Sequence, residues 1–447
     1  MSNAPFTPAG APSAVTPAQA FRYWLKLGFI SFGGPAGQIA LMHAELVERR
    51  RWISERRFLH ALNYCMVLPG PEATQLAIYI GWLLHGTWGG IVAGTLFVLP
   101  SLAILIGLSW VYLVWGSLPM VAGILYGIKP AVVAIVLAAA WRIGSRTIRN
   151  GLLLGIAIAA LAGIVAFELP FPLIVIAAAL AGLAGGRFAP EKFRVGGGHH
   201  AARHAHGPAL IDDDTPTPAH ARFTWRGLAL VAACGIGLGF AVWTLLALRF
   251  GLQSPLSAMA TFFTKAALLT FGGAYAVLPY VYQAAVETYR WLTPAQMIDG
   301  LALGETTPGP LIMIVAFVGF VGAWVKLGGA LAAIAGACVA TFFTFLPSYL
   351  FILAGGPLVE STRDDMRLTA PLTAISAAVV GVVVSLAWMF SWHVFRLGEA
   401  PARWDLVSMA IAAAAALALL RYKAGPIPVI GACGAAGLVV SYAMHLQ

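Results

Sequence analysis

Residues 31–35 read SFGGP, and residues 270–274 read TFGGA in the same register 239 positions later. Two further motifs recur in the same order: PGP at 69–71 and 308–310 and, after an eight-residue insertion in the second copy, LPS at 99–101 and 346–348. A single shared tripeptide can arise by chance, whereas a series in register indicates an internal duplication.

The composition places this duplication in a membrane. Hydrophobic residues make up 60% of the 447 residues, charged residues only 10%, and the mean hydropathy is +0.85. Soluble domains typically carry about 25% charged residues, and a soluble chain of this length cannot bury so much apolar surface. The sequence therefore predicts an all-α polytopic integral membrane protein, and it excludes soluble enzymes and nucleic-acid-binding domains.

Apolar stretches of about 20 residues, the length that a spanning helix needs, predict about thirteen transmembrane helices. They divide the chain into a flexible N-terminal tail (1–20), a first repeat (21–186), a polar, mobile His/Gly/Pro-rich linker (187–225), an extra helix (226–248) and a second repeat (258–444). Seven spans separate the two repeat starts. Because seven is odd, we expect inverted repeats, a common transporter architecture with its binding site near the bilayer midplane.

Lysine and arginine counts favour a cytoplasmic N-terminus, because cytoplasmic loops carry an excess of these residues. With that orientation, fifteen fall in inner segments and nine in outer loops. Five of the nine lie in the loop 49–57, on the wrong side. This misplacement suggests that segment 58–86 re-enters the membrane instead of spanning it. If only one segment per repeat re-entered, the copies would become parallel.

The Gly-Gly motifs predict helix breaks that face an anion. Two glycines, followed in the first copy by Pro35, interrupt the helical hydrogen-bond ladder, and free N–H groups at a half-helix N-terminus attract anions. A hydroxyl precedes each break and a lysine lies five residues before it. The glycines alone fit a close helix contact equally well, but an intramembrane charge indicates function. The candidate substrate ligands here are Lys26, Ser31, Gly33, Gly34, Lys265, Thr270, Gly272 and Gly273.

The PGP motifs predict a second discontinuous helix in each copy, since Pro-Gly-Pro cannot continue a helix. Broken backbone at membrane depth is tolerated where it lines a cavity or is buried in protein; the alternative is a kink that shapes packing. An acid lies within three residues of each motif, where the ionised form is disfavoured, and is a candidate proton carrier. The candidates are Gly70, Thr74, Gln75, Thr307 and Gly309 for substrate binding, Glu72 and Glu305 for proton coupling, and Pro35, Pro69, Pro71, Pro308 and Pro310 for helix breaking.

No metal, cofactor or enzyme chemistry is expected. The four cysteines lie in separate apolar stretches without ligand spacing, and no metalloprotease, serine hydrolase or P-loop pattern occurs. The linker histidines are a weak metal-binding pattern; a linker without a role in transport is the simpler interpretation. They are His199, His200, His204 and His206.

These motifs resemble those of the chromate ion transporter family in its long, two-domain form. The likeness covers nearly the whole chain and rests on FGGP at 32–35, RW at 51–52, LPGP at 68–71, TFGGAY at 270–275 and ETTPGPL at 305–311. The resemblance implies chromate efflux by antiport across a bacterial inner membrane, driven by the proton motive force and giving chromate resistance. It also implies thirteen spans, a cytoplasmic N-terminus and sulfate as a competing oxyanion.

The residues themselves support a secondary transporter for an anion and do not choose chromate over sulfate, phosphate or a carboxylate. A passive anion channel, a carrier for sulfate or another oxyanion, and a membrane protein with a structural role stay open. The expected partners are chromate, sulfate, protons and membrane lipid, without nucleic acid. A homodimer also stays open.

Overall fold

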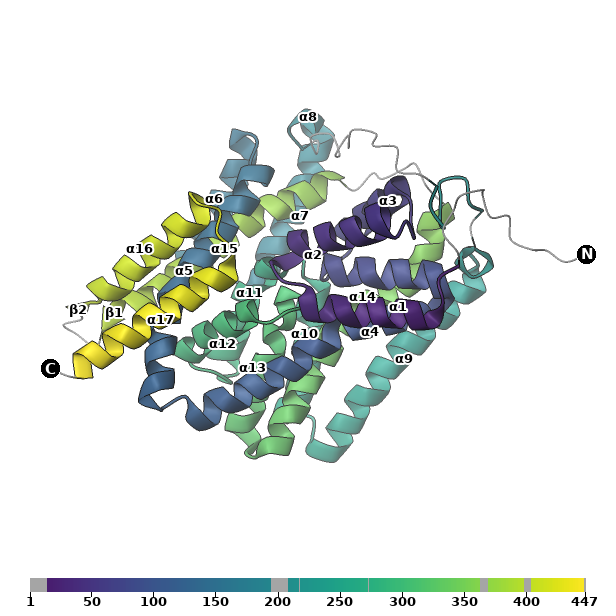
Figure 1. Cartoon of the computed structure of the whole chain (residues 1–447). Helices are drawn as coiled ribbons and strands as arrows, with labels where there is room; N and C mark the ends of the chain where they lie inside the picture. The colour runs from purple at the N-terminus through teal and green to yellow at the C-terminus, as the bar shows by residue number, and fades with distance from the viewer. Residues whose placement is uncertain are drawn as a thin grey trace, which may run out of the picture.

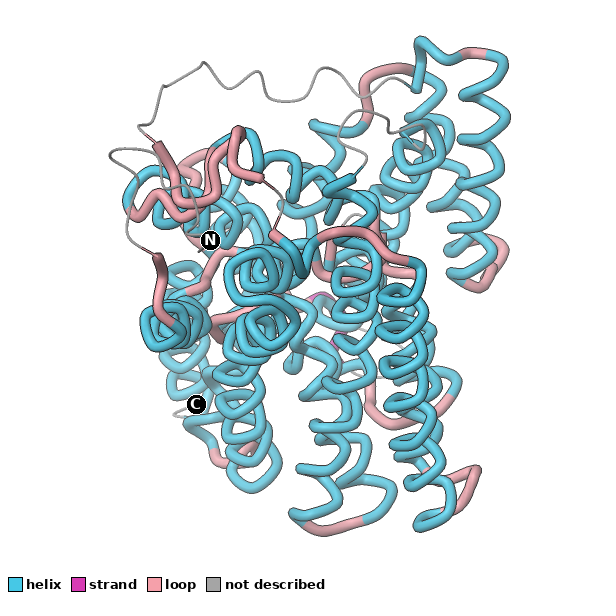
Figure 2. The backbone as a smooth tube through the Cα atoms, turned by 90° about the vertical axis from the view of Figure 1, so that its right-hand side faces the viewer, coloured by secondary structure: helices cyan, strands magenta, loops and turns pink. Residues whose placement is uncertain are grey.

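The computed structural model describes residues 14–193, 208–216, 218–271, 273–361, 369–397 and 403–445. These residues are almost entirely helical, as Figure 2 shows; the strands described are the two-residue pair β1 (Arg396–Leu397) and β2 (Arg403–Trp404). Seven of the described helices are long and apolar enough to cross a membrane. The prediction of an all-α, multi-pass membrane protein is confirmed.

The two repeats follow the same order of elements, except that α4 of the first corresponds to η4, α13 and α14 of the second; Figure 1 labels these helices. The first comprises α1 (Pro17–Ile30), α2 (Gly34–His43), the π-helical turn η1 (Ala44–Arg49), α3 (Glu55–Val67), α4 (Glu72–Trp115), α5 (Pro119–Thr147), α6 (Gly151–Val165) and α7 (Phe171–Phe188). The second comprises α10 (Pro255–Leu268), α11 (Ala274–Tyr282), the π-helical turn η3 (Gln283–Thr288), α12 (Pro294–Thr306), η4 (Leu311–Met313), α13 (Ile314–Leu327), α14 (Ala330–Ser361), α15 (Thr369–Phe395), α16 (Leu406–Leu420) and α17 (Pro426–His445). Between them lie α8 (Pro190–Phe193), η2 (Ala219–Ala221) and α9 (Trp225–Phe250).

The helix breaks fall at the predicted motifs. Gly33, Gly34 and Gly273 have φ values of +90°, +72° and +97°, and the PGP glycines Gly70 and Gly309 have +124° and +102°. Only glycine adopts such backbone readily. The prolines stand at helix starts: Pro35 opens α2, Pro71 precedes α4 and Pro310 precedes η4. Pro69 and Pro308 lie in the breaks themselves.

Each broken segment of the first repeat returns to the side from which it enters. Helix α4 turns sharply at His85–Gly86, and Gly81 packs against Ala93 across that turn, so residues 72–84 run antiparallel to the rest of α4. Nε2 of His85 lies 2.9 Å from the carbonyl oxygen of Val15, just before α1. Nε2 of His220 in the linker also lies 2.9 Å from the carbonyl oxygen of Trp82. Segments 21–43 and 58–86 therefore each begin and end at the linker's side of the molecule, as helical hairpins rather than single rods.

The side of the loop 49–57 is a correction to the sequence analysis. The backbone N–H groups of Leu210 and Ile211 in the linker donate to the carbonyl oxygens of Arg51 and Trp52, at 2.9 and 3.1 Å. The loop thus lies on the linker's side, not opposite it. The count failed because it treated the hairpin 21–43 as a crossing. Two of the seven predicted spans between the repeat starts are hairpins and do not cross. The number of crossings is therefore still odd, as inverted repeats require.

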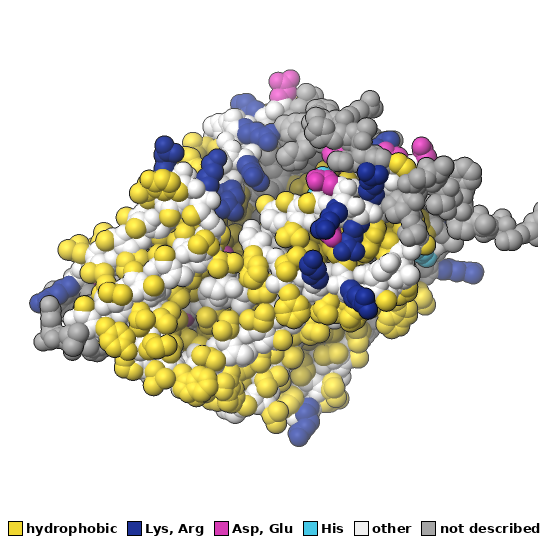
Figure 3. All heavy atoms as spheres, in the orientation of Figure 1, with side chains coloured by type: hydrophobic (Ala, Val, Ile, Leu, Met, Phe, Trp, Pro, Cys, Tyr) yellow, Lys and Arg dark blue, Asp and Glu magenta, His cyan; other side chains and the backbone are white. Residues whose placement is uncertain are grey.

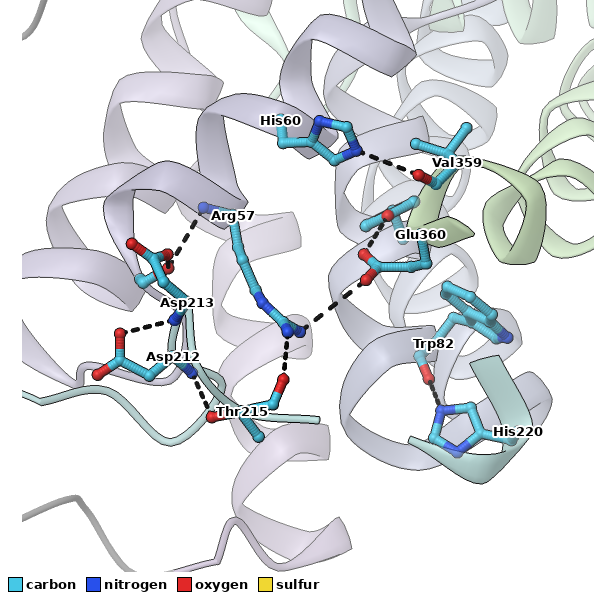
Figure 4. A network of polar contacts seen from close by, with 11 residues as sticks. Arg57, His60, Trp82, Asp212, Asp213, Thr215, His220, Val359 and Glu360 are labelled. Atoms are coloured by element: carbon cyan, nitrogen blue, oxygen red, sulfur yellow. Dashed lines mark hydrogen bonds and ion pairs between the residues drawn. The ribbon is translucent and has the colours of Figure 1, made fainter. Parts of the chain in front are cut away.

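The described part of the linker forms hydrogen bonds with the first repeat (Figure 4). Oγ of Ser54 donates to Asp213 at 2.6 Å, and Nη2 of Arg57 donates to the carbonyl oxygen of Thr215 at 2.5 Å. The same arginine lies 3.9 Å from buried Glu360 of α14. The linker therefore joins the first hairpins to the end of α14. Residues 194–207, which include the four linker histidines named above, lie outside the described residues. Residues 1–13 of the predicted tail also lie outside them, and α1 begins at Pro17, within the predicted tail.

The repeats interlock through exchanged helices. Helix α5 of the first repeat packs against α16 and α17 of the second, and α15 of the second packs against α6 and α7 of the first. Helices α5 and α15 also contact each other, as do α4 and α14. In Figure 3 hydrophobic side chains dominate the lower part of the surface in view, and most Lys and Arg side chains lie along its upper part. This distribution suits a chain with an apolar belt in the bilayer.

Candidate functional site

A cavity of about 710 Å³ lies where the broken segments of both repeats approach each other. Gly33 and Gly34 line it from the first repeat, and Gly273 lines it from the second. Its polar side chains are His43, Glu48, Glu72, Arg142, Arg146, Thr147, Tyr275, Glu305 and Ser376. Both Gly-Gly breaks and both candidate proton carriers thus share one space. Gly272 lies outside the described residues.

The two acids reach this cavity from opposite arms of their hairpins. Glu72 is the first residue of α4, directly after its PGP, whereas Glu305 lies near the end of α12, three residues before Pro308 of its PGP. Oη of Tyr275, on α11, donates to Oε1 of Glu305 at 2.5 Å. The acids do not align in the sequence, yet the fold brings both to the same cavity.

Arg142 and Arg146 supply the positive charge of the cavity. They lie four residues apart near the end of α5 and so share one helix face. Among the described residues, neither guanidinium forms an ion pair with a carboxylate, although Arg142 interacts electrostatically with Glu305. Sequence reasoning counted these arginines only as topology charges. The available signal was their i, i+4 spacing at the end of an apolar helix.

The structure does not bring the candidate lysines to the site. Lys26 and Lys265 are exposed and do not line the cavity. Lys26 lies five positions before Ser31, which is about 1.4 helical turns. Its side chain therefore points away from the face of α1 on which Trp24 and Leu27 are buried. The symmetry of the two lysines was real, but their helix face was overlooked.

The broken segments cross each other beside the cavity. The N–H of Gly70 donates to the carbonyl oxygen of Thr270 at 2.7 Å, and the N–H of Gly309 donates to that of Ser31 at 2.8 Å. Nε2 of Gln38 also donates to the carbonyl oxygen of Gly309, at 2.5 Å. Each PGP motif is thus held by the Gly-Gly break of the other repeat. We call these contacts the crossing.

The predicted polar ligands at the crossing divide into two groups. The hydroxyls of Thr270 and Thr307 donate to carbonyl oxygens of their own helices, at 2.7 and 2.9 Å, and Nε2 of Gln75 donates to the carbonyl oxygen of Pro69 at 2.8 Å. These side chains stabilise the breaks. The hydroxyls of Ser31 and Thr74 are buried and have no hydrogen-bond partner among the described residues.

The sequence model of the chromate transporter family matches twice, at residues 18–183 and 257–438. The chain belongs to the chromate transporter family. The two matches coincide with the two repeats, so the family's domain occurs once in each. The resemblance inferred from the motifs is confirmed, including the long, two-domain form.

Members of the chromate transporter family with a curated name align over most of this chain. The chromate transport protein of Pseudomonas aeruginosa is 33% identical over 97% of this chain and 95% of its own length. The chromate transport protein of Cupriavidus metallidurans is 30% identical over 82% of this chain and 80% of its own. A probable chromate transport protein of Synechococcus elongatus is 29% identical, with 82% of each covered. No solved structure matches significantly.

Proposed function

We propose that this chain exports chromate across the bacterial inner membrane, coupled to the proton motive force, and so confers chromate resistance. Sulfate, a similar tetrahedral dianion, is the expected competitor. The relatives named as chromate transport proteins support the substrate. The observation that carries the mechanism is one cavity shared by both Gly-Gly breaks, two arginines and the two candidate proton carriers.

The cavity suits loading from the cytoplasm. Glu48 and Arg146 line it at the ends of η1 and α5, and η1 leads into the loop that contacts the linker. With a cytoplasmic N-terminus, this is the cytoplasmic side. The unpaired guanidinium groups attract a dianion into the cavity, because charge focused in a cleft raises the local concentration of its counter-ion.

Glu72 and Glu305 are the proposed proton carriers. Moving an ionised carboxylate through the membrane is costly, so an empty carrier returns readily only when both acids are neutral. Protons taken up outside after chromate leaves would then be released inside when the next chromate loads, and in the loaded carrier Arg142 and Arg146 offset the charge of the two ionised acids. This sequence makes the exchange of chromate for protons obligatory and defines an antiporter.

The purified protein tests the proposal directly. Chromate should raise its unfolding temperature, and sulfate should do so at higher concentration, because a ligand that binds only the folded state stabilises it. Vesicles with an imposed proton gradient should then accumulate chromate against its gradient. A scaffold would show no oxyanion-dependent stabilisation, and a passive channel would bind chromate without uphill accumulation.

Arg142→Gln is expected to weaken chromate binding by about 1–3 kcal/mol, the usual loss of a hydrogen bond to a charged group. Lys26→Ala and Lys265→Ala are controls, because each removes a cation that does not line the cavity. Chromate titrations of thermal stability measure all three. Weaker binding in the lysine variants with an unchanged Arg142 variant would restore the lysines as ligands and contradict the assignment from the cavity.

Inverted repeats with a cytoplasmic N-terminus make a topological prediction. The equivalent loops around Trp52 and Trp291 should face the cytoplasm and the periplasm, respectively. Single cysteines introduced in these loops should differ in labelling by a membrane-impermeant reagent added to intact cells, with strong labelling only in the loop at Trp291. Equal labelling of both loops would show parallel repeats.

A further inference from the structure

The recurring LPS motif contains one serine in each repeat whose hydroxyl is buried without a hydrogen-bond partner. Ser101 on α4 and Ser348 on α14 are equivalent in the duplication, and each follows a proline inside its helix. Their exposed fractions are 0% and 1%. In the described part of the chain neither hydroxyl has a hydrogen-bond partner. The function proposed above does not use them.

Both serines abut the crossing. A Cβ atom built on Gly309 would lie 2.7 Å from Cβ and 3.2 Å from Oγ of Ser101. A Cβ atom built on Gly70 would lie 2.7 Å from Oγ of Ser348. The serine of each repeat therefore touches the PGP glycine of the other. Ser31, whose hydroxyl is also unpaired, lies at the crossing too, because its backbone carbonyl oxygen accepts from the N–H of Gly309.

Unpaired hydroxyls are costly here. A buried polar group without a hydrogen-bond partner lowers the stability of the fold by about 1–3 kcal/mol. A serine or threonine in a helix normally avoids this cost by donating to a carbonyl oxygen of the preceding turn. Thr264 and Thr344 of this chain do so, at 2.8 and 2.7 Å. Two equivalent serines that do not, beside two broken helices, indicate a partner that is not part of the protein.

We propose that Ser101 and Ser348 are ligands of the transported oxyanion, which binds dehydrated at the crossing after it leaves the arginine-lined cavity. This inference rests on the proposed function and deepens it. Separation of the two repeats would release the N–H groups of Gly70 and Gly309 from their carbonyl partners. The anion's oxygens then replace those carbonyls and accept from the two serine hydroxyls as well.

The ligand chemistry follows from the donors. The crossing offers neutral O–H and N–H groups, and hydrogen bonds from such donors to an oxyanion are shorter and stronger than those between neutral groups. A tetrahedral dianion has four oxygens to share among donors from both repeats. The arginines therefore collect the anion, and the crossing recognises its shape.

The test compares Ser101→Ala and Ser348→Ala with Ser109→Ala. Ser109 is also buried on α4 with an unpaired hydroxyl, but it lies eight residues, about 12 Å, farther along the helix. We expect the Kd for chromate to rise about tenfold in the first two variants, the effect of one lost hydrogen bond to a charged group. Ser109→Ala should bind chromate like the wild type. Ser101→Thr keeps a hydroxyl and should retain most of the affinity.

Thermal stability without chromate separates a ligand from a structural residue. Deleting an unpaired buried hydroxyl removes a cost, so Ser101→Ala and Ser348→Ala should unfold at the wild-type temperature or above it. Wild-type chromate affinity in both variants would overturn the inference. It would leave the proposed function intact, because that function is tested separately by uphill chromate transport of the wild-type protein. A fall in stability of the chromate-free protein would also overturn it, because the serines would then be structural.

Discussion

Glu305→Gln is expected to abolish uphill chromate transport while chromate binding and downhill exchange persist. Glutamine keeps the size of the side chain and its ability to accept from Tyr275, whose hydroxyl lies 2.5 Å from the carboxylate, but it is permanently neutral. Binding survives because no positive charge is lost from the cavity. Coupling fails because the empty carrier can now return without a proton, so the gradient no longer drives chromate.

The measurement is pH-driven chromate uptake into inverted membrane vesicles, with the amount of protein checked for each variant. Glu72→Gln should show the same loss, because its carboxyl lines the same cavity. Glu48→Gln is the matched control: it also lines the cavity, but its side chain is 50% exposed and pairs with His43. It should retain coupling.

An alternative role for Glu305 is purely structural, as the acceptor that holds Tyr275 and with it the start of α11. That role predicts poor expression of Glu305→Gln and an equal defect in Tyr275→Phe, which removes the hydrogen bond and keeps the acid. Proton coupling predicts normal expression of Glu305→Gln and uphill transport by Tyr275→Phe. Wild-type pH dependence in both glutamine variants would exclude the two acids as proton carriers.

The sequence predicts the breaks well because their cause is local. A positive φ at Gly33 or Gly309 and the missing N–H groups of the flanking prolines interrupt a helix wherever it packs. The duplication is equally visible, since it requires only a comparison of the chain with itself. From these two features the positions of the four helix breaks follow without the structure, and the fold class follows from the apolar composition.

The composition of the site was less predictable because it depends on contacts far apart in the sequence. Arg142 and Tyr275 belong to different repeats, and only the exchange of helices between the repeats brings them to one cavity. The side of the loop at Arg51 depends on hydrogen bonds to the linker, which apolar periodicity does not contain. Lys26, predicted as a ligand, lies outside the cavity for a third reason: an alignment preserves position but does not say which face of a helix meets the site.

Gly309→Ala should be among the most destabilising single substitutions in the second repeat. Its φ of +102° is strained for any residue with a Cβ, at a cost of about 1–3 kcal/mol. The added methyl would also lie 2.7 Å from Cβ of Ser101, and both atoms belong to rigid backbone positions. Relief requires the repeats to move apart, which breaks the hydrogen bond from Gly309 to Ser31.

Gly33→Ala provides the matched control for Gly309→Ala. Its φ of +90° is as unfavourable, but nothing lies within 4 Å of the added Cβ, so only the conformational cost remains. Thermal unfolding in detergent should therefore place Gly33→Ala between the wild type and Gly309→Ala. Equal unfolding temperatures for the two variants would mean that the crossing can open at no cost.

The double variant Gly309→Ala with Ser101→Gly separates packing from recognition at the crossing. Removing the Cβ of residue 101 makes room for the new methyl, at a cost of about 1 kcal/mol for glycine in a helix, so part of the lost stability should return. Chromate affinity should stay below that of the wild type, because the hydroxyl assigned to the anion is gone. Wild-type chromate affinity together with recovered stability would show that Ser101 only fills space. Recovered stability with weak chromate binding is the result expected if Ser101 is a ligand at the crossing.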